Sequence, residues 1–136
     1  MASDFAKKLI RDNEGVRLQY YKDSKGILTI GIGRNLEKGI SVEECVFMFE
    51  NDIVEAEITL GNIFGLEIFK ESEKRVAALL DLAFNLGEPR LRKFTRLIDA
   101  VKERDWPRAA EEAKNSLWYV QVGNRGKLIT NLLKTG

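Results

Sequence analysis

The sequence predicts an α+β fold that is mostly helical, with one small β-hairpin near the N-terminus. Residues 16–33 hold two short runs of β-branched and aromatic residues, separated by the turn-like tetrapeptide "DSKG". From residue 41 onward, helix-start and helix-stop signals follow one another without a further strand pattern. The segment 72–87, "SEKRVAALLDLAFNLG", is apolar on almost every face, which is typical of a helix at the centre of a core.

The first expected element is a helix from about Asp4 to Glu14. Ser3 stands in the N-cap position, where its hydroxyl can accept a hydrogen bond from a free backbone amide of the first turn. Gly15 follows the helix and suits the left-handed conformation that commonly ends one. The helix is therefore bounded at both ends by local signals.

Two strands are expected next, over residues 16–22 ("VRLQYYK") and 27–33 ("ILTIGIG"). The "DSKG" between them has Asp first and Gly fourth, which is the preference of a type I turn. These segments predict an antiparallel hairpin.

Helices are expected throughout the remainder of the chain. "SVEE" predicts a capping box between Ser41 and Glu44, opening a helix that fades near residues 60–61. The central helix is expected to end at Gly87. Three shorter helices are expected at about 95–104, 107–116 and 125–134.

The composition restricts the chemistry. The chain has 136 residues, of which 44% are apolar and 32% charged, as in one soluble globular domain. It has no histidine, which excludes serine–histidine and cysteine–histidine nucleophiles and argues against a zinc site; we expect no metal and no cofactor. Its one cysteine, Cys45, cannot form an internal disulfide. Acid–base chemistry near neutral pH therefore falls to carboxylates, lysines or tyrosines.

The net charge of +1 hides an asymmetry between the two halves. Residues 1–68 carry 8 Lys/Arg and 12 Asp/Glu, whereas residues 69–136 carry 14 and 9. From Leu117 onward there are bases and no acid. A basic half can favour an anionic polymer such as nucleic acid, a membrane surface or a cell wall, and an ordinary solvated face explains it equally well.

Two acids near the hairpin suggest divided roles. Glu14 falls in the last turn of the first helix, where the negative end of the helix dipole disfavours a charged carboxylate, so we expect it to hold its proton tightly. Asp23 opens the turn, where backbone amides and water favour its ionised form. Two acids with unlike proton affinities are typical of a general acid and base, as in glycoside hydrolysis. The spacing alone also fits two ordinary surface acids.

Three blocks of sequence resemble the phage-type lysozymes. The first is "NEGVRLQYYKDSKGILTIGIG", with Glu-Gly, a Tyr-Lys-Asp turn and Thr-Ile-Gly-x-Gly. The second is "RVAALLDLAFNLGEPRLRKFT", which is similar to the family's central helix and the loop after it. The third is "SLWYVQVGNRGKLITNLLKTG", which is similar to its C-terminal segment. The blocks stand in the family's order and cover nearly the whole chain.

The resemblance implies a muramidase that cleaves the β-1,4 bond between N-acetylmuramic acid and N-acetylglucosamine in peptidoglycan. Glu14 then corresponds to the general acid, Asp23 to the second carboxylate and Thr29 to the threonine that helps to place the attacking water. Arg125 corresponds to an arginine that pairs with the catalytic glutamate across the cleft. We expect inversion, with water activated by Asp23 on the ring face opposite Glu14.

The resemblance also places candidate substrate contacts, at Asn35, Phe84, Leu97 and Glu112. The residue types of Phe84 and Leu97 favour core positions, and Asn35 and Glu112 are also explained as plain surface. At Arg34 the family often has histidine, so a stabilising ion pair of some members is expected to be absent.

The resemblance further implies one lysozyme-like domain, with a hairpin lobe (about 15–60) and a helical lobe (about 1–14 and 61–136) on either side of a cleft. No signal peptide or membrane-spanning run is present, so we expect synthesis in a host bacterial cytoplasm and release through a holin pore to the periplasm. The expected partner is peptidoglycan, acted on by a monomer that neither binds nucleic acid nor inserts stably into a membrane.

Other functions fit parts of the sequence. A lytic transglycosylase needs only the glutamate, and a non-catalytic wall-binding protein needs neither acid. A helix-turn-helix DNA-binding module would use the basic half but not a leading hairpin with two acids. "TIGIGRNLEKG" has Leu36 where a dinucleotide-binding loop has its third glycine.

Overall fold

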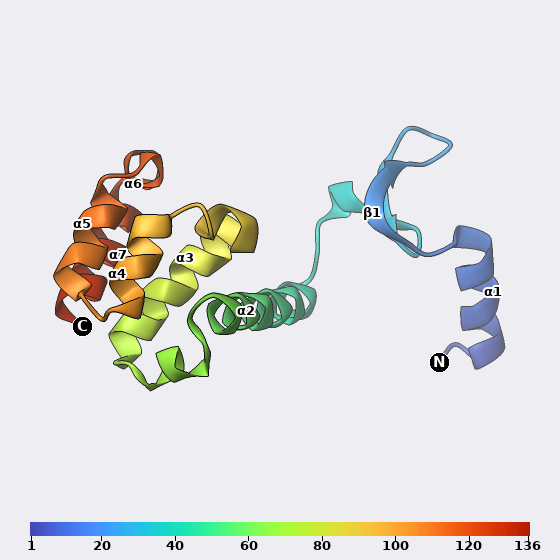
Figure 1. The fold of residues 1–136 in the computed structure, drawn as a ribbon. Coiled ribbons are helices and arrows are strands. Elements are labelled where there is room, and N and C mark those ends of the chain that lie inside the picture. Colours follow the sequence, from blue (N-terminus) through green and yellow to red (C-terminus); the bar gives the residue numbers. More distant parts are fainter. The chain divides into compact units, whose positions relative to one another are not determined.

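The computed structural model describes all 136 residues, and the chain divides into two compact units, residues 1–47 and 48–136. The predicted α+β fold, mostly helical with a small sheet, is confirmed (Figure 1). The elements in order are α1 (Asp4–Glu14), β1 (Arg17–Lys22), β2 (Leu28–Gly31), β3 (Arg34–Asn35), η1 (Leu36–Lys38), α2 (Val42–Phe64), η2 (Leu66–Lys70), α3 (Glu73–Leu91), α4 (Thr95–Lys102), α5 (Trp106–Lys114), α6 (Leu117–Val122) and α7 (Asn124–Thr135).

The first unit begins with α1, which has the predicted bounds. The hydroxyl of Ser3 accepts a hydrogen bond from the backbone N–H of Ala6 at 3.1 Å and so caps the first turn. At the other end, Gly15 has φ 74° and donates its N–H to the carbonyl of Arg11 at 2.8 Å. Both predicted helix-end signals are confirmed.

The sheet of the first unit has three antiparallel strands in the order β1-β2-β3. The predicted turn is present, since the N–H of Gly26 donates to the carbonyl of Asp23 at 2.9 Å. Thr29 pairs with Tyr21 on one side and with Asn35 on the other, so it lies on the central strand. The third strand was not predicted, because two residues are too few to show a strand periodicity.

Helix α2 opens with the predicted capping box. Ser41 accepts a hydrogen bond from the N–H of Glu44, and the Glu44 carboxylate accepts one from the N–H of Ser41. The prediction that this helix fades near residues 60–61 is wrong, because it continues to Phe64. Gly61 costs a helix about 1 kcal/mol relative to alanine, and the burial of the neighbouring apolar residues Leu60 and Ile63 offsets that cost.

Glu44 also forms an ion pair with Arg34, in which Nη1 of Arg34 lies 2.7 Å from Oε2 of Glu44. Arg34 thus forms an ion pair of its own at the position where the family often has histidine. The hydrogen bond from Arg34, with those from the backbone and hydroxyl of Ser41, lowers the pKa of Glu44 from its ordinary 4.5 to about 2. The capping box and the ion pair therefore join β3 to the start of α2.

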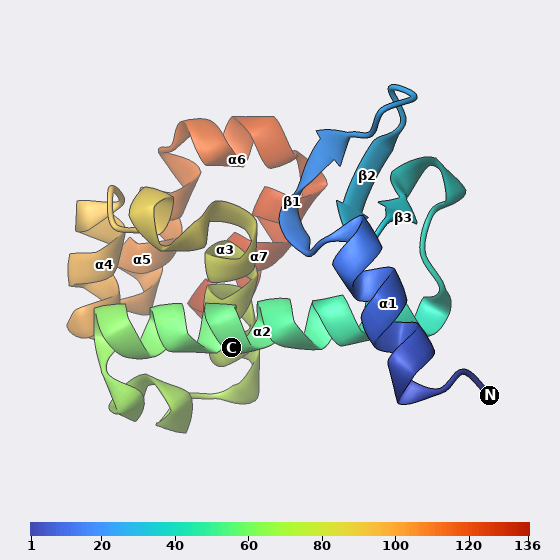
Figure 2. The same cartoon turned by 90° about the vertical axis from the view of Figure 1, so that its right-hand side faces the viewer.

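The second unit is built around α3, which lies among the other helices of this unit in Figure 2. Ala78, Leu79, Leu82 and Ala83 of α3 are buried, which confirms the predicted central helix. The buried apolar residues that α4, α5 and α7 contribute are Leu97, Ile98, Ala100, Val101, Trp106, Ala109, Ala110, Ala113, Ile129 and Leu133. Short helices with one apolar stripe each thus cover a helix that is apolar on almost every face.

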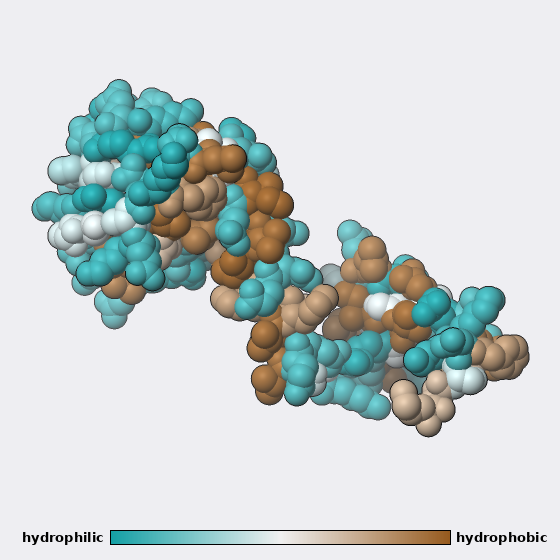
Figure 3. All heavy atoms as spheres, turned by 90° about the horizontal axis from the view of Figure 1, so that it is seen from below, coloured by the Kyte–Doolittle hydropathy of each residue, from teal (hydrophilic) through white to brown (hydrophobic).

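The helix was predicted to end at Gly87, but α3 instead kinks there and continues. Gly87 has φ 74° and ψ 165°, after which the helix resumes to Leu91 with Pro89 in its first turn. The three shorter predicted helices correspond to α4, α5 and α7. The sequence reasoning missed α6 and both 3₁₀ helices, η1 and η2. On the face of the second unit drawn in Figure 3, hydrophilic residues lie beside a patch of apolar ones.

The boundary between the units lies within α2, after Phe47. The predicted assignment of residues 1–14 to a helical lobe, and the cleft expected between the two lobes, remain predictions. No helix combines the length and the apolar composition that crossing a membrane requires.

Candidate functional site

Glu14 is the last residue of α1, immediately before the glycine that ends the helix. Its side chain lies against Gly33, which follows β2: a Cβ atom built on Gly33 would stand 2.6 Å from Oε2 of Glu14. Gly33 also has φ 65°, a conformation that favours glycine. Because Gly33 has no side chain, the carboxylate of Glu14 can lie in the space beside it. The ion pairs within this unit join Lys8 to Asp12 and Arg34 to Glu44, so neither involves Glu14.

Asp23 is held by the turn that it opens. Its Oδ1 accepts hydrogen bonds from the backbone N–H groups of Lys25, at 2.8 Å, and Ile27, at 2.9 Å. Its own backbone N–H donates to the carbonyl of Ile27 at 2.9 Å. The second carboxylate oxygen, Oδ2, has no hydrogen bond in the chain. Asp23 therefore presents one fixed oxygen and one that is free to accept a proton.

Thr29 is buried on the central strand, with 4% of its surface exposed. Its hydroxyl donates to the carbonyl of Ile27 at 2.9 Å, the residue whose N–H also binds Asp23. Because a hydroxyl has one proton and two acceptor positions, Thr29 can only accept a further hydrogen bond. A water molecule bound there would donate one proton to Thr29 and keep its lone pairs available.

The first unit thus positions all three predicted catalytic residues on rigid elements: a capped helix end, a hydrogen-bonded turn and a central strand. Two carboxylates and a hydroxyl acceptor can transfer protons and orient a water molecule, without any metal. No group of three or more cysteine or acidic side chains is placed to hold a metal ion.

Arg125, predicted to support Glu14, belongs to α7 of the second unit. There it forms a two-pronged ion pair with Asp81 of α3: Nε lies 2.9 Å from Oδ1 and Nη2 lies 3.1 Å from Oδ2. Such fork geometry fixes the plane of the guanidinium. The pairing of Arg125 with Glu14 remains a prediction.

The predicted substrate contacts fall in three places. Leu97 and Glu112 line one pocket of about 520 Å³ in the second unit, with the cationic side chains of Arg90, Lys93 and Arg96. Within this pocket Leu97 is only 2% exposed, so it offers little surface to a ligand.

Phe84 lines a different pocket of the second unit, between α2 and α3, and is 42% exposed. Its ring lies 5.9 Å from that of Phe49, at a tilt of 55°. Asn35 belongs to the first unit, where its side chain accepts a hydrogen bond from the N–H of Glu37 and caps η1. Of the three that belong to the second unit, Leu97 and Glu112 share a pocket and Phe84 lines another.

Comparison with known proteins assigns the chain. The phage lysozyme family model matches residues 11–134, which include Glu14, Asp23, Thr29 and Arg125. The chain belongs to the phage lysozyme family. It is 25% identical to the probable T4-type lysozyme 2 of Dictyostelium discoideum, with 96% of this chain and 94% of that protein aligned.

Two longer relatives also match. The chain is 27% identical to the pre-baseplate central spike protein of Enterobacteria phage T4, with 95% of this chain but only 27% of that protein aligned. It is 27% identical to a peptidoglycan hydrolase of Pseudomonas phage phiKMV, with 89% of this chain and 14% of that protein aligned. The chain therefore spans less than a third of the length of either of these two relatives.

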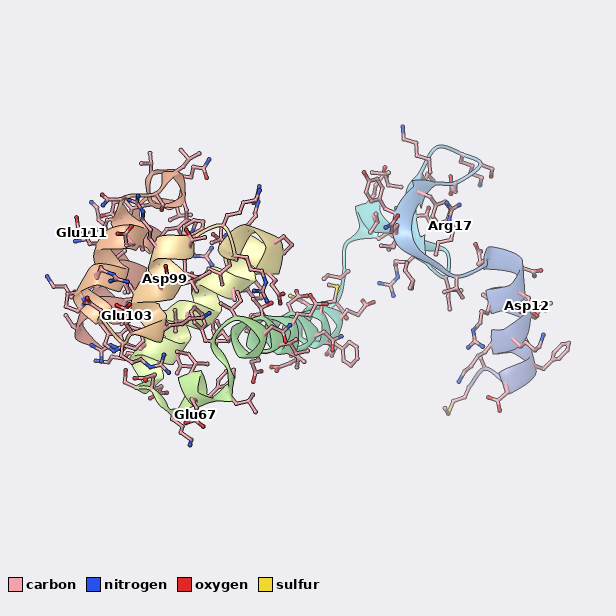
Figure 4. The ribbon with its side chains drawn as sticks, viewed as in Figure 1. Asp12, Arg17, Glu67, Asp99, Glu103 and Glu111 are labelled. Carbon is pink, nitrogen blue, oxygen red and sulfur yellow. The ribbon has the colours of Figure 1, made fainter.

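The structure adds residues that the sequence reasoning missed. Asp81 is one, because its partner Arg125 lies 44 residues away and no local pattern joins them. Arg17 is another: its guanidinium lies 4.2 Å above the ring of Tyr21 on the same strand (Figure 4). The register of β1 against β2 shifts between residues 17 and 21, so the regular alternation of a strand could not have predicted this contact.

Proposed function

We propose that this chain is a lysozyme that hydrolyses the β-1,4 bond between N-acetylmuramic acid and N-acetylglucosamine in peptidoglycan. The observation that carries the proposal is the arrangement within residues 1–47. Glu14 is held against Gly33 without an ion-pair partner in this unit, and Asp23 is fixed through one oxygen with the other free. Membership of the phage lysozyme family supports the substrate.

In the proposed mechanism, Glu14 donates its proton to the glycosidic oxygen as the bond to C1 breaks. A water molecule attacks C1 from the opposite face of the ring and transfers a proton to Oδ2 of Asp23. Thr29 accepts the second hydrogen bond from this water and so aims its lone pair at C1. The bond to C1 is replaced by a bond to water, and the configuration at C1 inverts.

The remaining predicted residues receive supporting roles. Arg125, oriented by Asp81, provides a fixed positive charge for the anionic form of Glu14. Phe84 offers an exposed aromatic face to a sugar ring, and Asn35 and Glu112 contact the glycan or its peptide. Leu97 is buried and supports the wall of the pocket that Glu112 lines. No step of this mechanism requires a cofactor.

In the cell, we propose that the enzyme acts as a monomeric endolysin. It would be made in the host cytoplasm, pass through a holin pore and lyse the cell from the periplasmic side. The phage proteins among its relatives, one of them a peptidoglycan hydrolase, support this setting.

The products of purified peptidoglycan test the chemistry. Hydrolysis adds one water per cleaved bond and leaves a reducing N-acetylmuramic acid, with inverted configuration in the first-formed product. A product with a 1,6-anhydro ring and no added water would identify a lytic transglycosylase instead. Binding to the insoluble wall without any soluble product would identify a non-catalytic wall-binding protein.

A further inference from the structure

Arg17 is a cation on β1 that has no partner among the charged side chains (Figure 4). In the chain it lies between the two proposed catalytic acids, three positions after Glu14 and six before Asp23. The ion pairs of the first unit involve other side chains, so Arg17 is paired with neither acid. Arg17 is exposed, and its guanidinium makes no hydrogen bond in the chain. Its N–H donors are therefore available to a ligand.

The position of the guanidinium depends on an irregularity of β1. Arg17 pairs with Gly31 of β2. Tyr21 pairs with Thr29, so four steps along β1 match two steps along β2. Four steps of a regular strand span about 14 Å and two span about 7 Å, and the bulge removes this difference. As a result the guanidinium carbon of Arg17 lies 4.2 Å from the centre of the Tyr21 ring.

Tyr21 connects Arg17 to the proposed catalytic residues. It lies directly opposite Thr29 in the ladder, and Thr29 lies opposite Asn35 on the next strand. Opposite residues of antiparallel strands have their side chains on one face of the sheet, with Cβ atoms about 5 Å apart. The half-buried Tyr21 ring therefore lies beside Thr29, and the guanidinium of Arg17 lies over that ring. A flat cation is thus one side chain away from the hydroxyl that is proposed to hold the attacking water.

The chemistry of a guanidinium limits what Arg17 can bind. It has only donors and a permanent positive charge, so it favours a hydrogen-bond acceptor and repels a cation. The hydroxyl groups of a glycan both donate and accept, whereas the carbonyl oxygen of an N-acetyl group only accepts. In N-acetylmuramic acid this group is on C2, next to the C1 atom that the water is proposed to attack. Stacking on Tyr21 orients the plane of the guanidinium before the sugar binds.

We propose that Arg17 donates hydrogen bonds to the N-acetyl carbonyl of the sugar whose bond is cleaved, and so makes the enzyme specific for N-acetylated glycan. This inference rests on the proposed hydrolysis of peptidoglycan and assigns a substrate-binding residue to the same site. Tyr21 is a positioning residue, because it acts through Arg17. A sugar without its acetyl group has an ammonium group on C2, which offers no acceptor and is repelled by the guanidinium.

The first test measures cleavage of soluble, fully N-acetylated glycan strands. In Arg17→Gln we expect KM to rise about tenfold and kcat to change by less than about twofold, because a charge-assisted hydrogen bond to the bound substrate is lost. The control Lys22→Gln removes a charge from the same strand, on the face opposite to Tyr21, and should keep both wild-type values. An unchanged KM in Arg17→Gln, or an equal rise in both variants, would overturn the inference.

The second test changes the acceptor on the sugar. On removal of the acetyl groups, kcat/KM of the wild type should fall about tenfold further than that of Arg17→Gln. N-formyl strands, which regain the carbonyl without the methyl group, should restore the wild-type value. An equal fall in both proteins, or no recovery with N-formyl strands, would contradict the assignment of the carbonyl as the acceptor.

The role of Tyr21 is tested through KM as well. Tyr21→Phe keeps the ring and should keep the wild-type KM. Tyr21→Leu should raise KM, and adding Arg17→Gln to it should raise KM no further, because the two side chains act as one unit. Additive increases would refute a role of Tyr21 through Arg17.

Binding separates this inference from the proposed function. Calorimetric titration of Glu14→Gln with N-acetylated strands measures binding without cleavage. Adding Arg17→Gln should raise the dissociation constant about tenfold, and adding Lys22→Gln should leave it unchanged. If this difference is found but the wild type cleaves no strand, the proposed hydrolysis fails and the role of Arg17 in binding stands. Cleavage by the wild type, with binding that does not depend on Arg17, would overturn this inference alone.

Discussion

The carboxylate of Glu14 occupies the space that a side chain at residue 33 would need. An added Cβ on Gly33 would lie 2.6 Å from Oε2 and 2.7 Å from Cδ of Glu14. A helix end and a β-turn thus meet at an acid and a glycine, which are 19 positions apart. The glycine is required both for its φ of 65° and for the absence of a side chain.

The first prediction concerns Gly33→Ala. The methyl group must displace the Glu14 carboxylate, so cleavage of peptidoglycan should fall at least about tenfold, because misplacing a catalytic group by about 1 Å costs on that order or more. The left-handed backbone should add about 1 kcal/mol of destabilisation. The control is Gly39→Ala, whose φ is 74° and whose added Cβ would have nothing within 4 Å. It should lose similar stability but little activity; equal activity losses would refute the displacement.

The second prediction separates the two functions of Asp23. Asp23→Asn keeps an oxygen that accepts from Lys25 and Ile27, so the turn and its stability should persist. The amide cannot take a proton from water, so activity should fall by roughly 10²–10⁴. Asp23→Ala should also lose about 1 kcal/mol of unfolding free energy, because two amides lose their acceptor. Denaturant unfolding and rates of wall cleavage give both values; a fully active Asp23→Asn would exclude Asp23 as the base.

The third prediction concerns pH and the Arg34–Glu44 pair. Hydrogen bonds from Arg34 and Ser41 lower the pKa of Glu44 from 4.5 to about 2. The stabilisation is therefore complete above pH 4.5 and is lost as the pH falls from 4.5 towards 2, where Glu44 becomes protonated. Melting temperature should fall more steeply over this range in the wild type than in Glu44→Gln. Glu43→Gln, which changes an acid in the same first turn without an ion pair, should keep the wild-type slope.

The fourth prediction concerns the Asp81–Arg125 pair. Both side chains are partly buried, at 31% and 39% exposed, and they share two hydrogen bonds. A double-mutant cycle with Asp81→Asn and Arg125→Gln should give a coupling of about 1 kcal/mol in urea unfolding. The comparison pair is Lys70–Glu67, whose side chains are 77% and 74% exposed (Figure 4). The coupling free energy of this exposed pair should be less than about 0.5 kcal/mol. Equal coupling free energies for the two pairs would show that the two-pronged geometry of Asp81–Arg125 gives no extra stability.

The local parts of the fold could be predicted from the sequence. The caps at Ser3 and Ser41 and the stop at Gly15 depend on hydrogen bonds between residues three or four positions apart. The cap of α6 carries a signal of the same kind, since Ser116 accepts from the N–H of Tyr119, and this signal was overlooked. Strand β3 has no such signal, because its two residues are extended only through pairing with β2.

The candidate site was predictable to a different extent in each unit. Glu14, Asp23 and Thr29 lie within 16 consecutive residues, so turn and strand rules place them. Interactions between residues far apart in the sequence do not follow from such rules. Asp81 contacts Arg125 only because α3 packs on α7. The burial of Leu97 likewise depends on the core formed by α3, α4 and α5. Long-range packing is therefore the part that the sequence leaves open.

The most direct test of the central claim is the rate of peptidoglycan cleavage by Glu14→Gln. Glutamine keeps the shape that lies against Gly33 but has no proton to give to the glycosidic oxygen. Purified walls and outer-membrane-permeabilised bacteria should be cleared at least about 10² times more slowly than by the wild type, with unchanged melting temperature. A rate equal to that of the wild type would contradict the account, because Glu14 would then not be the acid.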